Sequence, residues 1–382
     1  MFFAARNLLF ETGIREQEIT VTHENDIPVF FQVSGNSALS FDPFAAAFYL
    51  VSRYEEYLPH IQDQWGRYHP HESLAYRNNF LQLPVVNIWG KMITALITQK
   101  FPDEKPKARK YNVQLTVDVD NAWAFRQKGL IRTAGGFLRD AFRLNFHEIL
   151  LRFKVITGMT RDPFDCFEEL LGIQRKYKLK PVYFFLVADY GPNDRNIPIS
   201  SNRFQALIKS VADNAEIGVH PSFASASNPD MVREEINRLE QITRREVKKS
   251  RQHFLKILLP DTYTILPDLD IAHDYSMGYA AEIGFRAGIC TPFKFYNLDR
   301  EAEANLTVHP FGIMDATLRY YMKLNPEKAV EYLRPVIQNV QQVDGELCLL
   351  WHNETLSDYN RWKNWKPLLE ETLQAAVLKT DE

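Results

Sequence analysis

The chain has 382 residues, which is long enough for a sizeable hydrophobic core and for two domains. Hydrophobic residues make up 45% and charged residues 24%, values that are ordinary for a globular protein in water. The formal net charge of −3 argues against a nucleic-acid partner held by overall positive charge. It leaves open a local basic patch in the run from Arg244 to Arg251.

The cysteines and the N-terminus indicate where the protein is located. Cys166, Cys290 and Cys348 have no paired spacing and lie in apolar surroundings, which is typical of buried thiols in a reducing compartment. The N-terminus lacks a basic segment followed by a long apolar run, so we expect no signal peptide. No run of roughly 18 apolar residues is present, so we expect no transmembrane helix and a cytoplasmic protein.

Residues 1–108 are predicted to form a smaller N-terminal α+β domain whose role the sequence does not indicate. A short strand is expected at Val29–Val33. Asp42 and Pro43 are typical of the N-cap and first position of a helix, which we expect over residues 44–58. A second helix is predicted from Pro84 to Ile97, followed by a charged linker at residues 98–110.

The second domain, residues 109–382, opens with the stretch Tyr111–Trp123. Its alternating apolar residues predict a strand that ends at Asp118 and Asp120. Residues two apart on a strand point to the same side, so the two carboxylates are expected to project together. If both carboxylates are buried, their negative charge must be neutralised by a metal, another cation or a proton. A strand that ends in a solvated Asx turn is the structural alternative.

A basic, aromatic and amphipathic insertion follows at Ala124–Met159, and we expect two helices there. The insertion could cover the sheet, close over a site as a lid, or present a membrane or partner face. From Asp162 onward, helices and short apolar strands alternate, with Asp162 and Pro163 expected to begin the first helix.

This alternation predicts an α/β domain with a parallel sheet, either open or closed into a barrel. The expected strands are at residues 182–189, 216–220, 284–292, 306–314 and 347–351. The expected helices are at 162–173, 203–212, 228–242 and 326–340, and a loop and a further helix are expected within 269–279.

Polar side chains follow the short apolar strands of this domain: Asp118, Asp120, His220, Arg251, His253, Asp274, Asp315 and His352. The carboxyl ends of parallel strands meet at one edge, where α/β proteins place their chemistry. One acid and two histidines with an open position suit a catalytic divalent metal such as zinc. Such an ion polarises a carbonyl and lowers the pKa of a bound water to roughly 7.

In this hypothesis Asp118 is the general base and Arg251 holds it ionised through a charge-assisted pair. His352 protonates a leaving amine, so the set fits amide hydrolysis. The structural alternative for His352 is a histidine buried beside Trp351.

The order TVDVD, EIGVHPSFAS, SRQHF and LLWHNE resembles the motifs of the polysaccharide deacetylase family, also called NodB-homology or carbohydrate esterase 4. The resemblance covers roughly Lys110 to the C-terminus, and it implies a deformed (β/α) barrel. It implies Asp118 as base, Asp120 and His220 as metal ligands, Arg251 as the residue that steadies the base, and His352 after Leu349 in the last motif. The segments 271–292 and 310–318 resemble a bacterial subgroup with its own N-terminal domain of unknown function, and residues 41–57 resemble part of that domain.

The sequence departs from the family pattern at two points. The second histidine of the metal motif should fall at position 224, where this chain has Ala224. We therefore predict a metal site of Asp120, His220 and His253. The fourth motif, an Asp near a Trp, has no clear counterpart, although Asp274 or Asp315 could substitute.

Two functions remain open. One is a metal-dependent hydrolase that removes an acetyl or similar acyl group from an amino sugar in glycan metabolism. The other is a catalytically silent barrel that binds carbohydrate or acts in assembly. Candidate substrate-binding residues are Ser222, Asp274, Asp315, Trp351 and Glu354, and Trp351 could equally be a packing residue.

Overall fold

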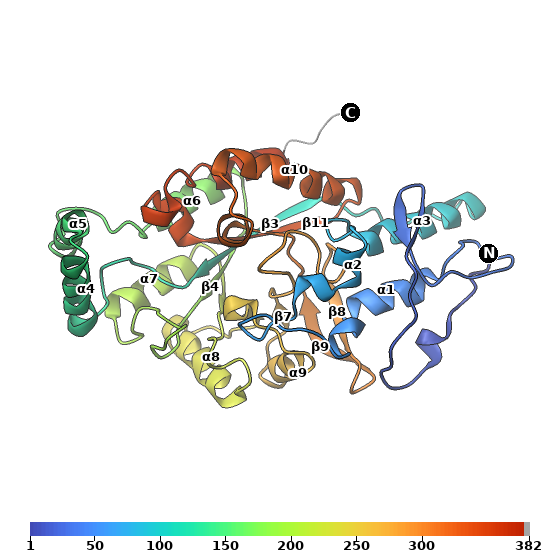
Figure 1. Cartoon of the computed structure of the whole chain (residues 1–382), viewed down its shortest axis with the longest axis horizontal. Coiled ribbons are helices and arrows are strands. Elements are labelled where there is room, and N and C mark those ends of the chain that lie inside the picture. Colours follow the sequence, from blue (N-terminus) through green and yellow to red (C-terminus); the bar gives the residue numbers. More distant parts are fainter. Residues whose placement is uncertain (378–382) are drawn as a thin grey trace. The chain divides into compact units, whose positions relative to one another are not determined.

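The computed structural model describes residues 1–377, and it is a mixed α/β structure with parallel strands (Figure 1). This confirms the predicted fold class, and no closed ring of strands is present in residues 1–377. The chain divides into two compact units. Unit 1 is Met1–Gln114 with Phe254–Leu349 and the residues from Ala375, and unit 2 is Leu115–His253 with Leu350–Gln374.

Unit 2 contains a sheet in the strand order β11-β3-β4-β5-β6, in which β3, β4, β5 and β6 pair parallel. The unit includes β3 from Leu115 onward and the last three residues of β11. Its strands are β3 (Asn112–Val119), β4 (Val182–Phe185), β5 (Glu216–Val219), β6 (Lys249–Ser250) and β11 (Glu346–His352). Its helices are α4 (Leu130–Phe142), α5 (Phe146–Ile156), α6 (Phe167–Lys176), α7 (Asn202–Ala212), α8 (Pro229–Thr243) and α11 (Leu368–Val377). Because β4 is buried along its whole length, it reads as a continuous apolar run.

Asp162 was expected to cap a helix, but it is not the N-cap of α6. The helix begins at Phe167. The Asp162 carboxylate accepts a local hydrogen bond from Phe164 N at 3.1 Å and three distant ones, from Ala124 at 2.7 Å, Phe125 at 2.9 Å and Arg126 at 3.0 Å. Asp162 therefore ties the first residues of the α4–α5 insertion to the segment that follows it.

Unit 1 contains the N-terminal segment and the strands β7, β9 and β8. Strand β7 pairs parallel with β9, and β9 pairs antiparallel with β8. Its helices are α1 (Pro43–Val51), α2 (Leu74–Arg77), α3 (Val85–Lys100), α9 (Asp261–Asp268) and α10 (Pro326–Gln342), and its strands are β1 (Thr22–Glu24), β2 (Ile27–Val29), β7 (His273–Asp274), β8 (Phe293–Asn297), β9 (Ala302–Val308) and β10 (Ile313–Met314).

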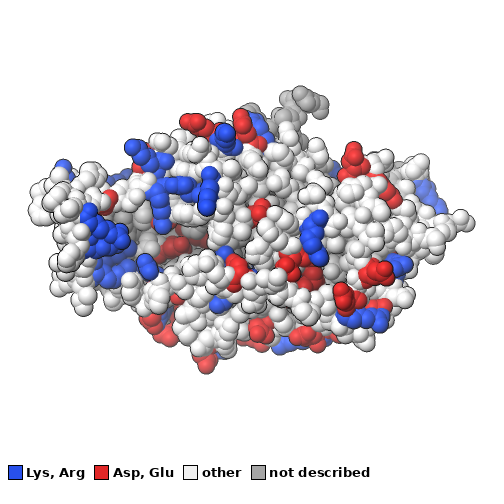
Figure 2. All heavy atoms as spheres, viewed as in Figure 1, with Lys and Arg blue, Asp and Glu red and all other residues white. Residues whose placement is uncertain are grey.

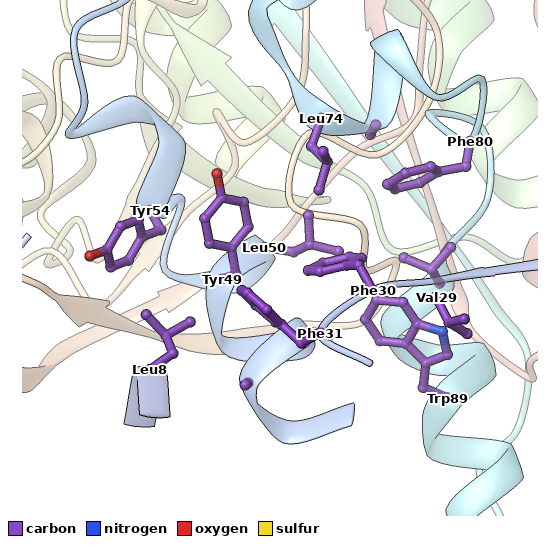
Figure 3. Close-up of a cluster of buried hydrophobic side chains, with 14 of the residues drawn as sticks. Leu8, Val29, Phe30, Phe31, Tyr49, Leu50, Tyr54, Leu74, Phe80 and Trp89 are labelled. Carbon is purple, nitrogen blue, oxygen red and sulfur yellow. The ribbon is translucent and has the colours of Figure 1, made fainter. Parts of the chain in front are cut away.

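A cluster of buried aromatic and aliphatic side chains forms the core of the N-terminal segment (Figure 3). Phe30 packs edge-to-face against Tyr49 of α1 and Trp89 of α3, with ring centroids 6.1 and 5.6 Å apart. Asp42 caps α1 as predicted, since its carboxylate accepts hydrogen bonds from Phe44 and Ala45 N–H. This packing holds α1 and α3 together.

Two expectations for the N-terminal segment are wrong. Strand β2 ends at Val29, because Phe31 adopts a left-handed φ of 61°, and beyond it only Gln32 forms an isolated bridge. The helix expected over residues 44–58 ends at Val51, because Arg53 has a φ of 57° and turns its guanidinium into the protein. A short 3-10 helix follows at Tyr54–Glu56.

Two further expectations are wrong in the segment after α9. Residues 284–292 form no strand, because Gly284 and Gly288 have φ of 128° and 62°. A Cβ at Gly284 would lie 2.4 Å from the Leu81 carbonyl oxygen, so only glycine fits there. The helix expected at 269–279 is α9, which lies earlier in the chain, and residues 273–274 form β7 instead.

None of the helices within residues 1–377 is both long and apolar enough to cross a bilayer.

Candidate metal centre and active site

The strand register of unit 2 brings the polar strand ends to one edge of the sheet. Val119 of β3 pairs with Phe185 of β4, which pairs with Val219 of β5, and Val219 pairs with Ser250 of β6. The residues directly after these strand ends include Asp120, His220 and Arg251. The parallel sheet therefore gathers side chains that are far apart in the sequence.

Three of these side chains have the arrangement of a metal site. One carboxylate oxygen of Asp120 and one ring nitrogen each of His220 and His253 lie within 4.8 Å of one another. His220 Nε2 is 3.3 Å from Asp120 Oδ1, and His253 Nε2 is 3.7 Å from Asp120 Oδ2. The two imidazole rings are 5.0 Å apart between centroids.

Each histidine is held by an acceptor on its other ring nitrogen. His220 Nδ1–H donates to the backbone carbonyl of Arg251, and His253 Nδ1–H donates to Asp194 Oδ1 at 2.8 Å. Since a carbonyl and a carboxylate only accept hydrogen bonds, both Nδ1 atoms carry the proton. The Nε2 atoms then face Asp120, which is the orientation in which each can offer a lone pair to a metal once it has lost its proton.

The charges around Asp120 perturb its neighbours. Burial alone would raise the pKa of Asp120, but His253 and His220 hold it well below its ordinary value. Burial alone would lower the pKa of His253, but the carboxylates of Asp120 and Asp194 raise it to about 9. A cation is therefore favoured at this position, whether it is a proton on His253 or a metal ion in its place.

The surroundings of one Asp120 oxygen indicate whether these residues fit a metal. Asp120 Oδ1 is buried and has no hydrogen-bond partner among residues 1–377. A buried carboxylate oxygen without a partner is costly unless a cation compensates it. One carboxylate and two imidazoles are the donor set of a catalytic zinc-type site with an open position, so the residues fit a divalent metal.

The predicted base is positioned beside these ligands. Asp118 is 2% exposed, and its Oδ1 accepts a hydrogen bond of 2.9 Å from Arg251 Nη1. The Arg251 guanidinium is fully buried and lies over the ring of Phe184, 4.7 Å from its centroid. The other oxygen of Asp118 is 3.6 Å from His220 Nε2. Arg251 thus holds two residues of the site. Its side chain orients the carboxylate of Asp118, and its backbone carbonyl orients the ring of His220.

His352, at the end of β11, lies close to Asp120 of the same cluster. Its Nε2 is 4.0 Å from Asp120 Oδ2, and its side chain is 15% exposed. It is therefore close enough to the cluster, and sufficiently open to solvent, to meet a substrate bound there.

Asp194 is a functional candidate that the sequence did not single out. It is 2% exposed, and besides His253 it accepts hydrogen bonds from Phe223 N at 2.8 Å and Ala224 N at 3.2 Å. Burial alone would raise the pKa of Asp194, but the bonds to His253 and Phe223 lower it. Asp194 therefore supports the turn at Ala224, where the family pattern has a histidine. It also holds His253, which we predict to replace that histidine as a metal ligand.

The residues predicted to bind substrate lie in different surroundings. Ser222 is 1% exposed, its N–H donates to Glu235, and its hydroxyl accepts from Ser225 N. Trp351 is fully buried, and Glu354 accepts from Arg361 at 2.6 Å. Their roles stay predictions.

Asp274 and Asp315 belong to unit 1 and are fully buried. Asp274 accepts hydrogen bonds from Tyr263 and Ser276. Asp315 accepts one from Ala316 N. A substrate contact for either residue also stays a prediction.

The arrangement defines a class: a carboxylate and two histidines suited to a metal, beside a second carboxylate held by an arginine, at the strand ends of a parallel α/β sheet. Solved structures to which the chain is similar include polysaccharide deacetylases and other CE4 proteins. A candidate polysaccharide deacetylase from Mycobacterium smegmatis has 16% identity and a TM-score of 0.44, covering 71% of this chain and 86% of that one. The polysaccharide deacetylase of Bacillus cereus has 12% identity and a TM-score of 0.33, covering 70% and 87%.

A CE4 family pseudoenzyme from Bacillus anthracis has 13% identity and a TM-score of 0.33, covering 72% of this chain and 66% of that one. The family named in these descriptions is the one that the motifs of the sequence suggested. Residues 1–102 match a family of unknown function, DUF7033. None of the curated proteins matches the sequence.

Proposed function

We propose that unit 2 is a metal-dependent hydrolase that removes an acetyl or similar acyl group from the nitrogen of an amino sugar or sugar conjugate. One observation carries the proposal. The buried Oδ1 of Asp120 accepts no hydrogen bond within residues 1–377 and lies 3.3 Å from His220 Nε2, and a second carboxylate held by a buried arginine lies beside them. An ion pair with only a structural role would not need Asp118 and Arg251 beside it.

Asp120, His220 and His253 would hold the metal, and zinc suits one oxygen and two nitrogen donors. When bound, a metal of this kind supplies a Lewis acid that polarises the amide carbonyl. Asp118 accepts the proton of the attacking water, and Arg251 fixes the direction of its carboxylate. His352 donates a proton to the nitrogen as the C–N bond breaks, which releases a carboxylic acid and an amine.

The proposal is tested by acetate release from a panel of N-acetylated sugars and sugar nucleotides, with and without a chelator. We expect release from at least one substrate and its loss when the metal is removed. Release that continues unchanged in the chelator would contradict the metal-dependent mechanism.

A silent carbohydrate-binding barrel is favoured by one observation, the alanine at position 224. In that case the protein would bind the same sugars without releasing acetate. Binding without release across the panel, from protein that contains metal, would select this second function.

The ligand role of His253 gives a prediction on metal content. His253→Ala is expected to weaken zinc affinity more than Asp194→Asn does, because the first removes a ligand and the second removes only its support. Loss of such a support typically costs about 10–100-fold in affinity. Metal analysis of the purified variants, followed by competition with a chromophoric chelator, measures both effects.

His147→Ala is the matched control, because His147 is exposed on α5 and is not part of the cluster. Equal metal content and affinity in the wild type and His253→Ala would remove His253 from the ligand set.

A further inference from the structure

Unit 2 contains a basic cavity next to the predicted metal site. Its lining includes neither the predicted base nor the predicted metal ligands. It has a volume of about 500 Å³, which is in the range of small-molecule sites. Asn121, the residue directly after Asp120, lines it, and helices α4 and α5 contribute much of its wall. Figure 2 shows basic side chains gathered on this side of the protein, where Figure 1 places α4 and α5.

The charge of the lining is strongly positive. Six basic side chains line the cavity, and only two acidic ones do: Lys128, Arg132, Arg139, Arg143, Arg152 and Arg195, with Asp140 and Glu148. Asp140 is bound by Arg152 at 2.6 Å and by Arg139 at 3.0 Å. Glu148 accepts a hydrogen bond from Tyr359. Both acids are therefore engaged, and four cations are left without an acidic partner in the lining.

The cavity is built around this charge. Arg152 is 5% exposed, and a Cβ at Gly136 would lie 2.6 Å from its Nη1, so the absence of a side chain on α4 makes room for the guanidinium. Lys128 donates to Asn121 at 2.6 Å. Burial, with a contribution from Arg132, lowers the pKa of Lys128 to about 7, although Asp162 and Glu354 act in the opposite direction.

We propose that this cavity binds a phosphate-class anion carried by the substrate, so that the substrate of the proposed hydrolase is a phosphorylated or diphosphate-linked amino sugar. The inference rests on the proposed function for its link to catalysis. Guanidinium groups recognise phosphate through paired charge-assisted hydrogen bonds, and a cavity of this volume can also hold the attached sugar. The exposed ring of Tyr190, over which the Arg132 guanidinium lies at 4.2 Å, offers an apolar wall for such a sugar.

Calorimetry on the full chain with N-acetylglucosamine 1-phosphate and with N-acetylglucosamine tests the proposal, because the two ligands differ only in the phosphate. We expect the phosphorylated sugar to bind at least about tenfold more tightly. The double variant Lys128→Ala, Arg143→Ala should lose that difference, while Arg175→Ala, an exposed arginine of α6, should keep it.

The same titration on Asp120→Ala separates this proposal from the proposed function. Tighter binding of the phosphorylated sugar that survives in Asp120→Ala places the anion in the cavity and not on a metal. Equal affinities for the two sugars, or a preference that disappears in Asp120→Ala but survives in the double variant, would overturn the proposal. An absence of acetate release would leave the binding result unaffected.

The α4–α5 hairpin carries a second feature, a set of exposed apolar side chains. Ten large hydrophobic side chains between Leu130 and Met159 are exposed: Leu130, Ile131, Leu138, Phe142, Leu144, Phe146, Leu150, Phe153, Ile156 and Met159. Phe142 is 87% and Phe146 71% exposed, at the turn between the helices. The sequence from Arg126 to Met159 has seven Lys and Arg residues against two acidic ones, although the whole chain is net negative.

We infer that this hairpin docks on the surface of an anionic lipid bilayer. Apolar side chains on one face and basic ones beside them are the features of helices that lie in a membrane interface. The local positive charge, five of whose seven basic residues also line the cavity, complements anionic headgroups. A second copy of the chain would bring the same positive charge against itself, which disfavours that occupant.

Co-sedimentation of the full chain with vesicles tests this inference. We expect binding to vesicles of phosphatidylcholine with phosphatidylglycerol, weaker binding to phosphatidylcholine alone, and release at high salt. Phe142→Asp with Phe146→Asp should weaken binding at least about tenfold. Phe10→Asp, at a residue 77% exposed in unit 1, should leave it unchanged.

Equal binding of the double variant, or an absence of binding to anionic vesicles, would overturn the membrane assignment. A concentration-dependent dimer in solution that the double variant abolishes would assign the face to a second copy instead.

Discussion

Replacing Asp118 by Asn is expected to lower kcat for acyl removal by about 10²–10⁴-fold, the usual contribution of a general base. The amide keeps the size of the side chain but cannot accept the proton. Metal content should stay close to that of the wild type, because Asp118 is outside the ligand set of Asp120, His220 and His253. Initial rates of acetate release, with metal analysis of the same samples, measure the split.

The variant also leaves the buried Arg251 guanidinium opposite a neutral group, so its folding needs a check by thermal unfolding. Asp118→Glu keeps the charge and displaces the carboxylate by one methylene, which should still cost about 10²-fold through misplacement. Asp213→Asn, 69% exposed on its side chain, is the control. Wild-type rates in Asp118→Asn would remove Asp118 as the base.

Replacing Glu56 by Gln is expected to destabilise the protein by about 3–5 kcal/mol, the cost of leaving a buried cation unpaired. Glu56 is 5% exposed, and its carboxylate accepts hydrogen bonds from Arg53 at 2.7 Å and from Arg286 at 2.5 and 2.8 Å. All three residues belong to unit 1. Urea unfolding followed by circular dichroism measures the loss, with Glu303→Gln on the exposed face of β9 as the control.

The same carboxylate gives a pH dependence. Burial alone would raise the pKa of Glu56, but Arg286 and Arg53 lower it to about 2 from an ordinary value of 4.5. Because the folded-state pKa is depressed, its stabilisation is present above about pH 4.5 and is lost as the pH falls toward 2. The wild type should lose stability in that window, and Glu56→Gln should lose less. A Glu56→Gln variant within about 0.5 kcal/mol of the wild type, with an unchanged acid transition, would contradict this account.

The parts of the site that the sequence predicted are those governed by strand geometry. Asp118 and Asp120 share a side because the strand period is two, and His220 and Arg251 follow short apolar runs that end at the same edge. The alanine at position 224 directed attention to His253, which lies with Asp120 and His220 in the structure.

Asp194 escaped prediction because it lies in a long polar loop after β4, where no periodic pattern marks a buried acid. The cavity escaped for a related reason. The amphipathic pattern of residues 124–159 predicted two helices, but a sequence pattern does not indicate which side of a helix will be covered. Strand β8 was not predicted because the apolar residues of 284–292 suggested an earlier strand, whereas the glycines at positions 284 and 288 turn the chain there.

The three hydrogen bonds that Asp162 accepts from residues 124–126 fasten the beginning of the helical hairpin to the chain that leaves it. The insertion therefore departs from the sheet and returns to it at nearly the same place. A segment attached in this way can be lengthened, shortened or exchanged with little effect on the strands that carry Asp118 and Asp120. Changes within the hairpin would alter the basic cavity and the exposed apolar side chains, and so the ligand or surface that the protein meets, without displacing Asp118 and Asp120.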